Sequence, residues 1–194
     1  MTGPIRQFLS SDHDRLDTIL RSALARPGEV DLPSFRAFRA GLLRHIALEE
    51  KILLPAARAA RSGEPLSVAE RLRVEHGALT SLLVPTPSRE IVAEIRSILG
   101  PHNEVEESDG GLYDACDALL ARSAPELIER MRTYPEVKVA PFKDGPGVHR
   151  TAASALAGSA RQIHRPPATP RSQPPPGSTT PTAGSSPDNP KEDL

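Results

Sequence analysis

The sequence has few of the residues on which several classes of protein depend. Its 194 residues include one cysteine and no tryptophan, and aromatic residues make up only 3% of the chain. A single cysteine, Cys116, can build neither an internal disulfide framework nor a zinc site made of cysteines, so we interpret it as a small packed residue. The chain also lacks the run of about 18 apolar residues that a membrane helix needs, and its N-terminus lacks the apolar segment of a secretory signal. We therefore expect a soluble, cytoplasmic protein.

Neither sign of charge dominates the chain. It holds 24 basic and 25 acidic residues, for a net charge of −1, and no basic block stands out. Proteins that bind nucleic acids usually present a concentrated basic patch. We therefore expect neither nucleic acid nor a membrane as a partner.

Apolar residues recur at spacings of three and four in four successive segments, which is the pattern of helices with one buried face. Turn signals such as Pro27-Gly28 and Pro85-Thr86-Pro87 separate these segments. Because the loops are short, successive helices should be antiparallel neighbours. The sequence therefore predicts an all-α fold with helices over about 9–24, 33–61, 70–83 and 88–106.

A few residues indicate where these helices begin or bend. Asp31 can cap the second helix, and the pair Ser67-x-x-Glu70 has the spacing of a capping box for the third. Pro55 should kink the second helix near its end, and Pro101 should bend the fourth.

The pattern weakens after residue 106 and divides the chain into three parts. Residues 1–122 form the main helical domain, and residues 123–164 are expected to form short helices and an extended linker. Residues 165–194 hold nine of the 21 prolines and almost no apolar residue, so they cannot bury enough surface to order themselves. We interpret this Pro/Ser/Thr-rich segment as a disordered tail, and we identify no protein partner for it, although proline-rich runs can bind aromatic-lined grooves.

Four of the six histidines fall on the buried faces of four successive predicted helices, and two of them precede an inward glutamate by four residues. An unpartnered buried carboxylate costs several kcal/mol, and a metal ion is one remedy. One inward histidine alone would more often be a hydrogen-bonded core residue, but four in matching positions favour a metal site. The predicted metal ligands are His13, His45, Glu49, His76, His102 and Glu106.

The ligand types limit the choice of metal. Four imidazoles and two carboxylates are too many for one tetrahedral zinc ion, whereas two bridging carboxylates with two imidazoles per metal suit a pair of divalent ions. Imidazole together with carboxylate suits iron, and small ligands can occupy any open coordination position. The remaining histidines, His149 and His164, lie beyond the main domain, so we expect neither to bind the metals.

The order His13, then His45-x-x-x-Glu49, then His76, then His102-x-x-x-Glu106 resembles the hemerythrin-like (HHE) cation-binding domain family over residues 4 to 122. The stretch LLRHIALEEKILLP in particular looks like the second helix of that family. The resemblance implies an up-and-down antiparallel four-helix bundle around a centre of two non-haem iron ions. It also implies that His13 and His45 bind one iron, that His76 and His102 bind the other, and that Glu49 and Glu106 bridge them.

The chain departs from the family pattern in two places. Oxygen-carrying hemerythrins have a second histidine one turn before the third-helix ligand, where this chain has Leu72. A tyrosine that usually follows the fourth helix comes two residues late, at Tyr113, after Gly110-Gly111. Three acidic residues could replace the missing ligand but point away from the buried faces, so we expect them to be solvated: Glu50, Glu75 and Glu107.

The expected function is that of a diiron protein that binds or reacts with a small diatomic or peroxide ligand, namely O2, NO or peroxide. Leu72 in place of a ligand favours a sensor, scavenger or store over a bulk oxygen carrier. A diiron oxidoreductase of the ferritin type is an alternative, but such proteins use Glu-x-x-His pairs, which this sequence lacks. The other alternative is a metal-free helical interaction module in which the tail does the binding.

Overall fold

A computed structural model describes residues 2–164, and all regular structure in that range is helical, which confirms the predicted all-α class. The tail predicted at residues 165–194 lies outside the described residues. The elements are α1 (Pro4–Ala23), α2 (Leu32–Leu48), the π-helical turn η1 (Glu49–Leu53), α3 (Leu54–Ala60), α4 (Ala69–Leu82), α5 (Arg89–Glu107), α6 (Leu112–Leu120), α7 (Ala124–Arg132) and α8 (Ala152–Ile163).

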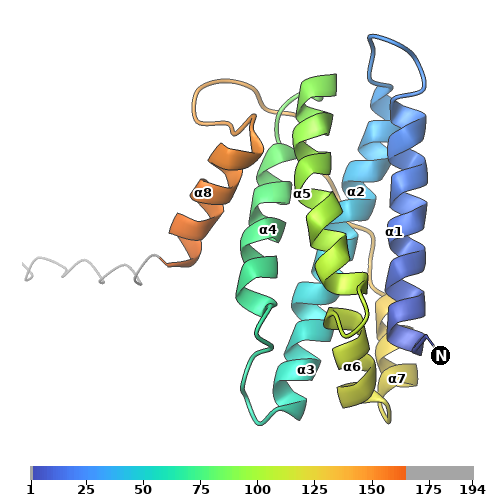
Figure 1. Ribbon diagram of the computed structural model, residues 1–194. Coiled ribbons are helices and arrows are strands. Elements are labelled where there is room, and N and C mark those ends of the chain that lie inside the picture. Colours follow the sequence, from blue (N-terminus) through green and yellow to red (C-terminus); the bar gives the residue numbers. More distant parts are fainter. Residues whose placement is uncertain (1, 165–194) are drawn as a thin grey trace, which may run out of the picture.

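Four long helical segments lie side by side, and the chain alternates in direction from one to the next (Figure 1). They are α1, the continuous run α2–η1–α3, α4 and α5. The shorter helices α6 and α7 pack near the end of the molecule where α1 begins. Each long segment turns its apolar face inward because burial of that face is what stabilises a helix of this length in water.

The buried apolar residues form two clusters, and a histidine lies between them on α1 and on α4. On α1, for example, Leu9 belongs to one cluster and Leu16 to the other, with His13 between them. The lower cluster includes Ile5, Leu9, Leu48, Leu53, Leu72, Tyr113 and Cys116, and the upper cluster includes Leu16, Leu20, Phe38, Leu42, Leu79 and Ile95. A layer of polar side chains therefore lies between two apolar cores.

The irregularity predicted near Pro55 is a widened turn rather than a simple kink. In η1 the N–H of Leu54 bonds to the carbonyl of Glu49, five residues back. Proline has no N–H and its ring crowds the preceding turn, so a π-type turn before it relieves the conflict within a continuous helix. Glu49 lies in this turn, and π-turns inside helices are frequent at functional sites.

The helix ends agree with the sequence in part. Asp31 accepts a hydrogen bond from the N–H of Ser34 at 2.9 Å, which confirms the cap predicted for α2. The capping box predicted at Ser67 is wrong, because α4 begins only at Ala69 and has no side-chain cap. Ser67 instead belongs to the preceding turn, which the hydrogen bond from the N–H of Ala69 to the carbonyl of Leu66 closes. On α5 the helix continues through Pro101 without a break.

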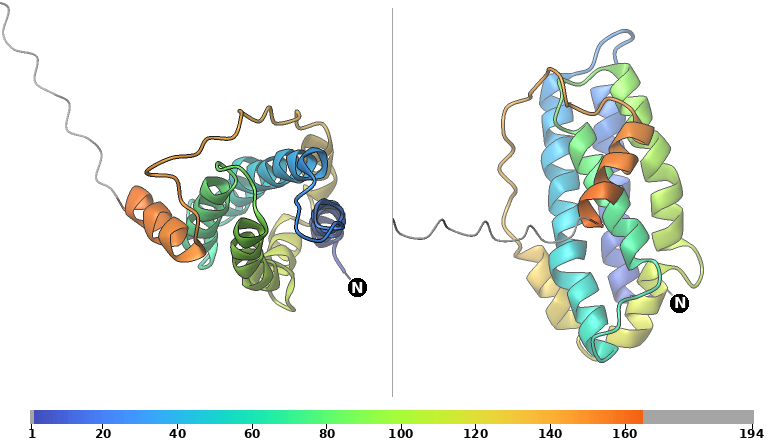
Figure 2. Two further views of the ribbon diagram at one scale, coloured as in Figure 1. Left: turned by 90° about the horizontal axis from the view of Figure 1, so that it is seen from above. Right: turned by 90° about the vertical axis from the view of Figure 1, so that its left-hand side faces the viewer.

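The chain after α7 returns to the long helices. The segment between α7 and α8 passes along the outside of α2 (Figure 2), where the carbonyl of Ala140 accepts a hydrogen bond from Arg39 at 2.7 Å. Helix α8 then packs on α4 so closely that a Cβ at Gly77 would lie 2.2 Å from the Ser159 hydroxyl oxygen. The division of the chain at residue 122 stays a prediction. Among residues 2–164, none of the helices combines the length and apolar character required to span a membrane.

Candidate metal centre

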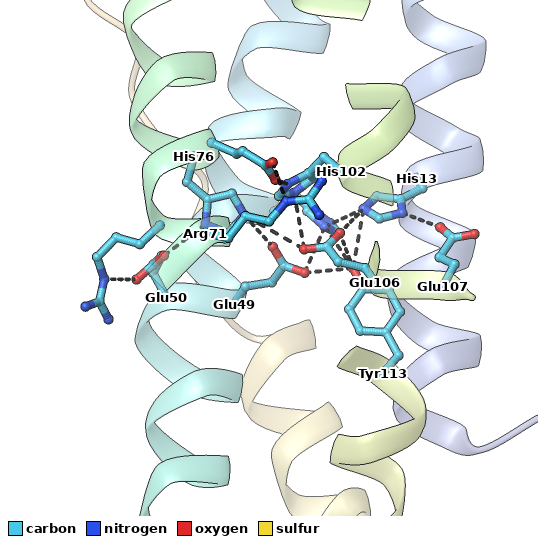
Figure 3. Close-up of polar contacts among 12 residues, drawn as sticks. His13, Glu49, Glu50, Arg71, His76, His102, Glu106, Glu107 and Tyr113 are labelled. Atoms are coloured by element: carbon cyan, nitrogen blue, oxygen red, sulfur yellow. Dashed lines mark hydrogen bonds and ion pairs between the residues drawn. The ribbon is translucent and has the colours of Figure 1, made fainter. Parts of the chain in front are cut away.

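All six residues predicted as metal ligands lie in the polar layer between the two apolar clusters. Figure 3 shows His13 of α1, Glu49 of η1, His76 of α4, and His102 and Glu106 of α5 pointing toward one another. The exposed fractions of the six side chains are all small: His13 8%, His45 1%, Glu49 0%, His76 3%, His102 2% and Glu106 0%. Four histidines and two carboxylates thus share one buried space.

The six side chains form two groups that share Glu106. In the first, one ligand atom from each of Glu49, His76, His102 and Glu106 lies within 4.8 Å of all the others. In the second, the same is true of His13, His45 and Glu106, and Glu49 lies 3.5 Å from His45 Nε2. The histidines therefore pair as the family resemblance implies, with both carboxylates between the pairs.

The first group has buried atoms that lack hydrogen-bond partners. His76 Nε2 and Glu49 Oε2 are 3.1 Å apart but are not aligned as a hydrogen bond, and Glu106 Oε1 also has no hydrogen bond within the described chain. An unsatisfied buried polar atom costs about 1–3 kcal/mol. A cation among these atoms would satisfy all three at once, so the residues present fit a metal ion.

The second group gives independent evidence for a cation. The Nε2 atoms of His13 and His45 lie 2.8 Å apart. The Nδ1 atom of each ring contacts a carboxylate, Glu107 for His13 and Asp12 for His45, so each Nδ1 must carry a proton to donate. In two neutral rings the Nε2 lone pairs would then face each other. Only a proton or a metal ion between them removes this repulsion.

Four further carboxylates contact the outer nitrogen, Nδ1, of the four histidines in this layer, one carboxylate for each histidine. Each comes from the helix that precedes the histidine in the order α1, α2–η1, α4, α5 and back to α1, so the contacts close a ring. The pairs are Asp12 with His45 Nδ1 at 3.0 Å, Glu50 with His76 Nδ1 at 2.9 Å, Glu75 with His102 Nδ1 at 2.8 Å, and Glu107 with His13 Nδ1. We call these four residues the outer carboxylates.

This ring overturns one expectation from the sequence. Glu50, Glu75 and Glu107 were expected to be solvated, but each is partly buried and bonded to a histidine. Such partners fix the tautomer of a metal-binding histidine and aim its Nε2 at the metal. Arginines on the surface pair with three of the outer carboxylates: Arg15 with Asp12 at 2.7 Å, Arg71 with Glu75 at 2.8 Å, and Arg73 with Glu50 at 3.4 Å.

Tyr113 also belongs to the site, although the sequence did not predict it. Its hydroxyl donates to Glu49 Oε1 at 2.7 Å and lies 3.2 Å from Glu106 Oε2. The same oxygen is 3.4 Å from His13 Nε2 and 3.5 Å from His45 Nε2. Burial, together with the charges of both glutamates, raises the pKa of this phenol well above its usual value, so it keeps its proton.

The turn after α5 explains how a tyrosine that comes late in the sequence reaches the site. Gly110 has a φ of 74°, a conformation that favours glycine, and it reverses the chain between α5 and α6. A Cβ at Gly111 would lie 2.7 Å from the carbonyl oxygen of Val105, so the turn also needs a glycine there. Helix α6 then carries Tyr113 back beneath the site (Figure 3).

Other candidate positions do not contribute ligands to this layer. Leu72 is fully buried in the lower cluster, so α4 adds no third imidazole to those of His76 and His102. Burial raises the pKa of Cys116 to about 12, and its thiol therefore stays protonated. His149 contacts Ser154 and His164 contacts Glu70, and that neither binds the metals stays a prediction.

The carboxylates change the acidity of the histidines. Burial alone would lower the pKa of His45, but the charge of Glu49 and the hydrogen bond to Asp12 outweigh it and raise the pKa to about 10. For His102, burial is likewise outweighed by hydrogen bonds to Glu106 and Glu75, and the pKa rises to about 9. Before a metal binds, both imidazoles therefore hold an extra proton at pH 7.

Metal uptake is therefore expected to release protons and to strengthen with pH. An imidazole must lose the proton on Nε2 to bind a metal, so filling the centre at pH 7 should release at least the two protons of His45 and His102. The overall binding constant should then rise by about 100-fold for each pH unit between 7 and the lower of the two pKa values. Anaerobic titration with Fe(II) in a weakly buffered solution with a pH indicator measures both effects. A binding constant that does not change over this range would contradict the protonation of His45 and His102.

Replacing Tyr113 with phenylalanine should destabilise the protein before any metal is added. Glu49 Oε1 would lose the hydroxyl that donates to it, and an unsatisfied buried oxygen costs about 1–3 kcal/mol. Urea unfolding of metal-free protein measures this loss. Tyr134→Phe is the matched control, because Tyr134 is only partly buried against the lower cluster, and it should change stability by less than about 0.5 kcal/mol. Equal effects of the two changes would show that the Tyr113 hydroxyl makes no important bond.

Comparison with known proteins agrees with this geometry. The family model described as the hemerythrin HHE cation binding domain matches residues 5–109, which is more than half of the chain. The match includes all six predicted ligands and the four outer carboxylates, and it ends before Tyr113. No curated protein and no solved structure matches the chain.

Proposed function

The chain belongs to the hemerythrin HHE cation-binding domain family, and from this we propose that it is a non-haem diiron protein that binds or reacts with O2, NO or peroxide. The four long helical segments would then form the up-and-down bundle of the hemerythrins. His13 and His45 would bind one iron, His76 and His102 the other, and Glu49 and Glu106 would bridge them.

The observation that carries this proposal is a group of three buried ligand atoms without hydrogen-bond partners, namely His76 Nε2, Glu49 Oε2 and Glu106 Oε1. In the other half of the site, the Nε2 atoms of His13 and His45 lie 2.8 Å apart while carboxylates occupy both Nδ1 atoms. A proton can join these two nitrogens before metal binds, and a metal ion can replace that proton. Each half of the site thus has its own reason to hold a cation.

The protein contributes a buried, hydrogen-bonded environment to this chemistry. Two bound iron ions would supply redox chemistry and open coordination positions for a small ligand. The outer carboxylates hold every imidazole in one tautomer, and the apolar clusters above and below the layer exclude water. The Tyr113 hydroxyl keeps its proton and donates it in a hydrogen bond to Glu49 Oε1.

Within this family we propose a sensor, scavenger or store rather than an oxygen carrier. The iron held by His76 and His102 would have no third imidazole, because Leu72 occupies that position on α4. More of its coordination positions would be open to water or small ligands. Such an iron is suited to reaction or exchange more than to reversible binding of O2.

The experiment that tests this function is optical spectroscopy of the iron-loaded protein after oxidation in air and after addition of azide. A diiron centre with open positions should bind azide and change its visible absorption. The parallel measurement is the rate of oxidation of the reduced protein by O2, NO and hydrogen peroxide. Iron-loaded protein whose spectrum and oxidation rate respond to none of these ligands would rule out the proposed function.

A further inference from the structure

A cavity of about 230 Å³ lies beside the His13 half of the metal centre, between α1, α2 and α5. Its walls are mainly apolar and belong to the upper cluster or pack against it. The apolar side chains that line it are Leu16, Leu20, Phe38, Leu42 and Leu99.

The cavity ends at the metal centre. His13 and Asn103 line it, and each lies closer along its helix to the polar layer than the other lining residues of α1 and α5 do. His13 is also the most exposed of the six predicted ligands, at 8%. From His13 to Leu20 the helix rises by about 10 Å, so the cavity extends roughly two helical turns from the layer. It lies on the side of the layer opposite to Tyr113, which belongs to the lower cluster.

Opposite charges stand at the outer part of the cavity. Arg96 of α5 and Asp17 of α1 lie 3.9 Å apart, and each side chain is 45% exposed. Asp17 also pairs with Arg21 at 2.5 Å, so the one carboxylate that lines the cavity is already engaged by arginines. A charge placed among the apolar walls would lose its hydration without gaining a partner there. The lining therefore favours an uncharged molecule.

The size of the cavity sets the size of its ligand. A 150 Å³ cavity lined by leucine, isoleucine and phenylalanine is large enough to bind benzene. The present cavity is larger still, at about 230 Å³. A diatomic molecule, which needs about as much space as the roughly 30 Å³ share of one water molecule, would leave most of it empty.

We propose that this cavity binds the organic group of an uncharged peroxide or alcohol, R–O–OH or R–OH, with R about the size of a benzene ring. The oxygen end lies toward His13, and R packs against the apolar walls. This inference rests on the proposed function and narrows its substrate from small peroxides in general to organic ones.

Benzyl alcohol is a suitable probe, because it has the expected size and shape and does not oxidise the protein. It should bind the iron-loaded protein saturably with one site per chain, as measured by isothermal titration calorimetry. Benzoate, with a similar ring but a negative charge, should bind at least about tenfold more weakly.

Leu99→Trp should fill the cavity and weaken benzyl alcohol binding by at least about tenfold, because the added ring takes space that the probe needs. The matched control is Leu119→Trp, which places the same side chain on the surface, where Leu119 is 38% exposed. The control should bind benzyl alcohol as tightly as the natural protein. If Leu99→Trp loses helical structure, Leu99→Phe replaces it as the smaller change, with Leu119→Phe as its control and an expected weakening of at least about threefold.

Three results would overturn the inference: no saturable binding of benzyl alcohol, tighter binding of benzoate, or equal binding by folded Leu99 and Leu119 variants. Iron content measured on the same samples distinguishes failure of the cavity proposal from failure of the proposed diiron function. Two irons per chain without benzyl alcohol binding would refute only the organic ligand. Benzyl alcohol binding by a chain that takes up no iron would refute the diiron function and leave the cavity as a binding site.

Discussion

Glu49→Ala is expected to lower the iron content from about two per chain to nearly none. Glu49 is fully buried, and its two oxygens face both histidine pairs, with Oε1 3.5 Å from His45 Nε2 and Oε2 3.1 Å from His76 Nε2. Among the described residues, only one other carboxylate, Glu106, lies near the Nε2 atoms of both histidine pairs. In the proposed centre, removing Glu49 would therefore take a ligand from both metal positions at once.

The same change should lower the helix content, because the buried Nε2 atoms of His45 and His76 lose the carboxylate that they face, and removing one partner of a buried ion pair costs about 3–5 kcal/mol. Iron analysis and circular dichroism measure the two effects. Glu64→Ala is a control for the loss of an exposed glutamate and should change neither quantity. Glu50→Ala should be intermediate, with metal affinity reduced about 10- to 100-fold, because Glu50 contacts His76 Nδ1 and is not one of the six predicted ligands. A Glu49→Ala protein that still binds two irons would show that Glu49 is not a ligand.

Leu72→His is expected to make the iron that we propose for His76 and His102 harder to remove. Leu72 lies one turn before His76 on α4 and is fully buried, so a histidine there adds an imidazole next to that iron. A chelator must then displace one more ligand, and loss of iron should slow by about tenfold or more. Oxidation in air should also slow, because one position is closed to water and O2.

Leu72→His should also lower the stability of the metal-free protein, and this effect can be measured separately from the slower loss of iron. Before iron is bound, the loss of apolar contacts in the lower cluster should destabilise the protein by about 2–5 kcal/mol. Leu72→Gln is the control, since it puts a polar side chain of similar size in the same place without an imidazole, and it should destabilise the protein without retaining iron longer. If Leu72→His leaves both the chelation and the oxidation rates unchanged, another side chain already completes this iron, and the argument against oxygen carriage fails.

The positions of the six candidate ligands could be predicted from the sequence because they depend on periodicity within single helices. His45 and Glu49, four residues apart, share a helix face whatever the helix packs against. Local sequence also predicted the cap at Asp31 and the start of a helix near Ser88, and the structure confirms both. That the six residues bind iron remains a prediction.

The outer carboxylates could not be predicted in this way, because their role depends on the space between two helices. Glu75 points away from the buried face of α4, which in one helix is the pattern of a solvated residue. In the assembled protein it points at His102 on the neighbouring α5. One feature of the sequence could have indicated their role: each outer carboxylate is adjacent in sequence to a candidate ligand.

Tyr113 was missed for a related reason. Its place in the site depends on how far the chain turns at Gly110 and Gly111, and spacing along the sequence does not report that rotation. The capping box at Ser67 failed because a turn occupies that position and moves the start of α4 to Ala69. Both cases concern chain between helices, where periodicity gives no information.

The most direct test of the diiron centre is the iron content of the full chain after anaerobic loading with Fe(II) and removal of unbound metal. Two groups of buried ligand atoms share Glu106, so we expect about two irons per chain. The value should fall to nearly zero in Glu49→Ala and stay at two in Glu64→Ala. A chain that takes up no iron, or only one, under these conditions would contradict the diiron centre.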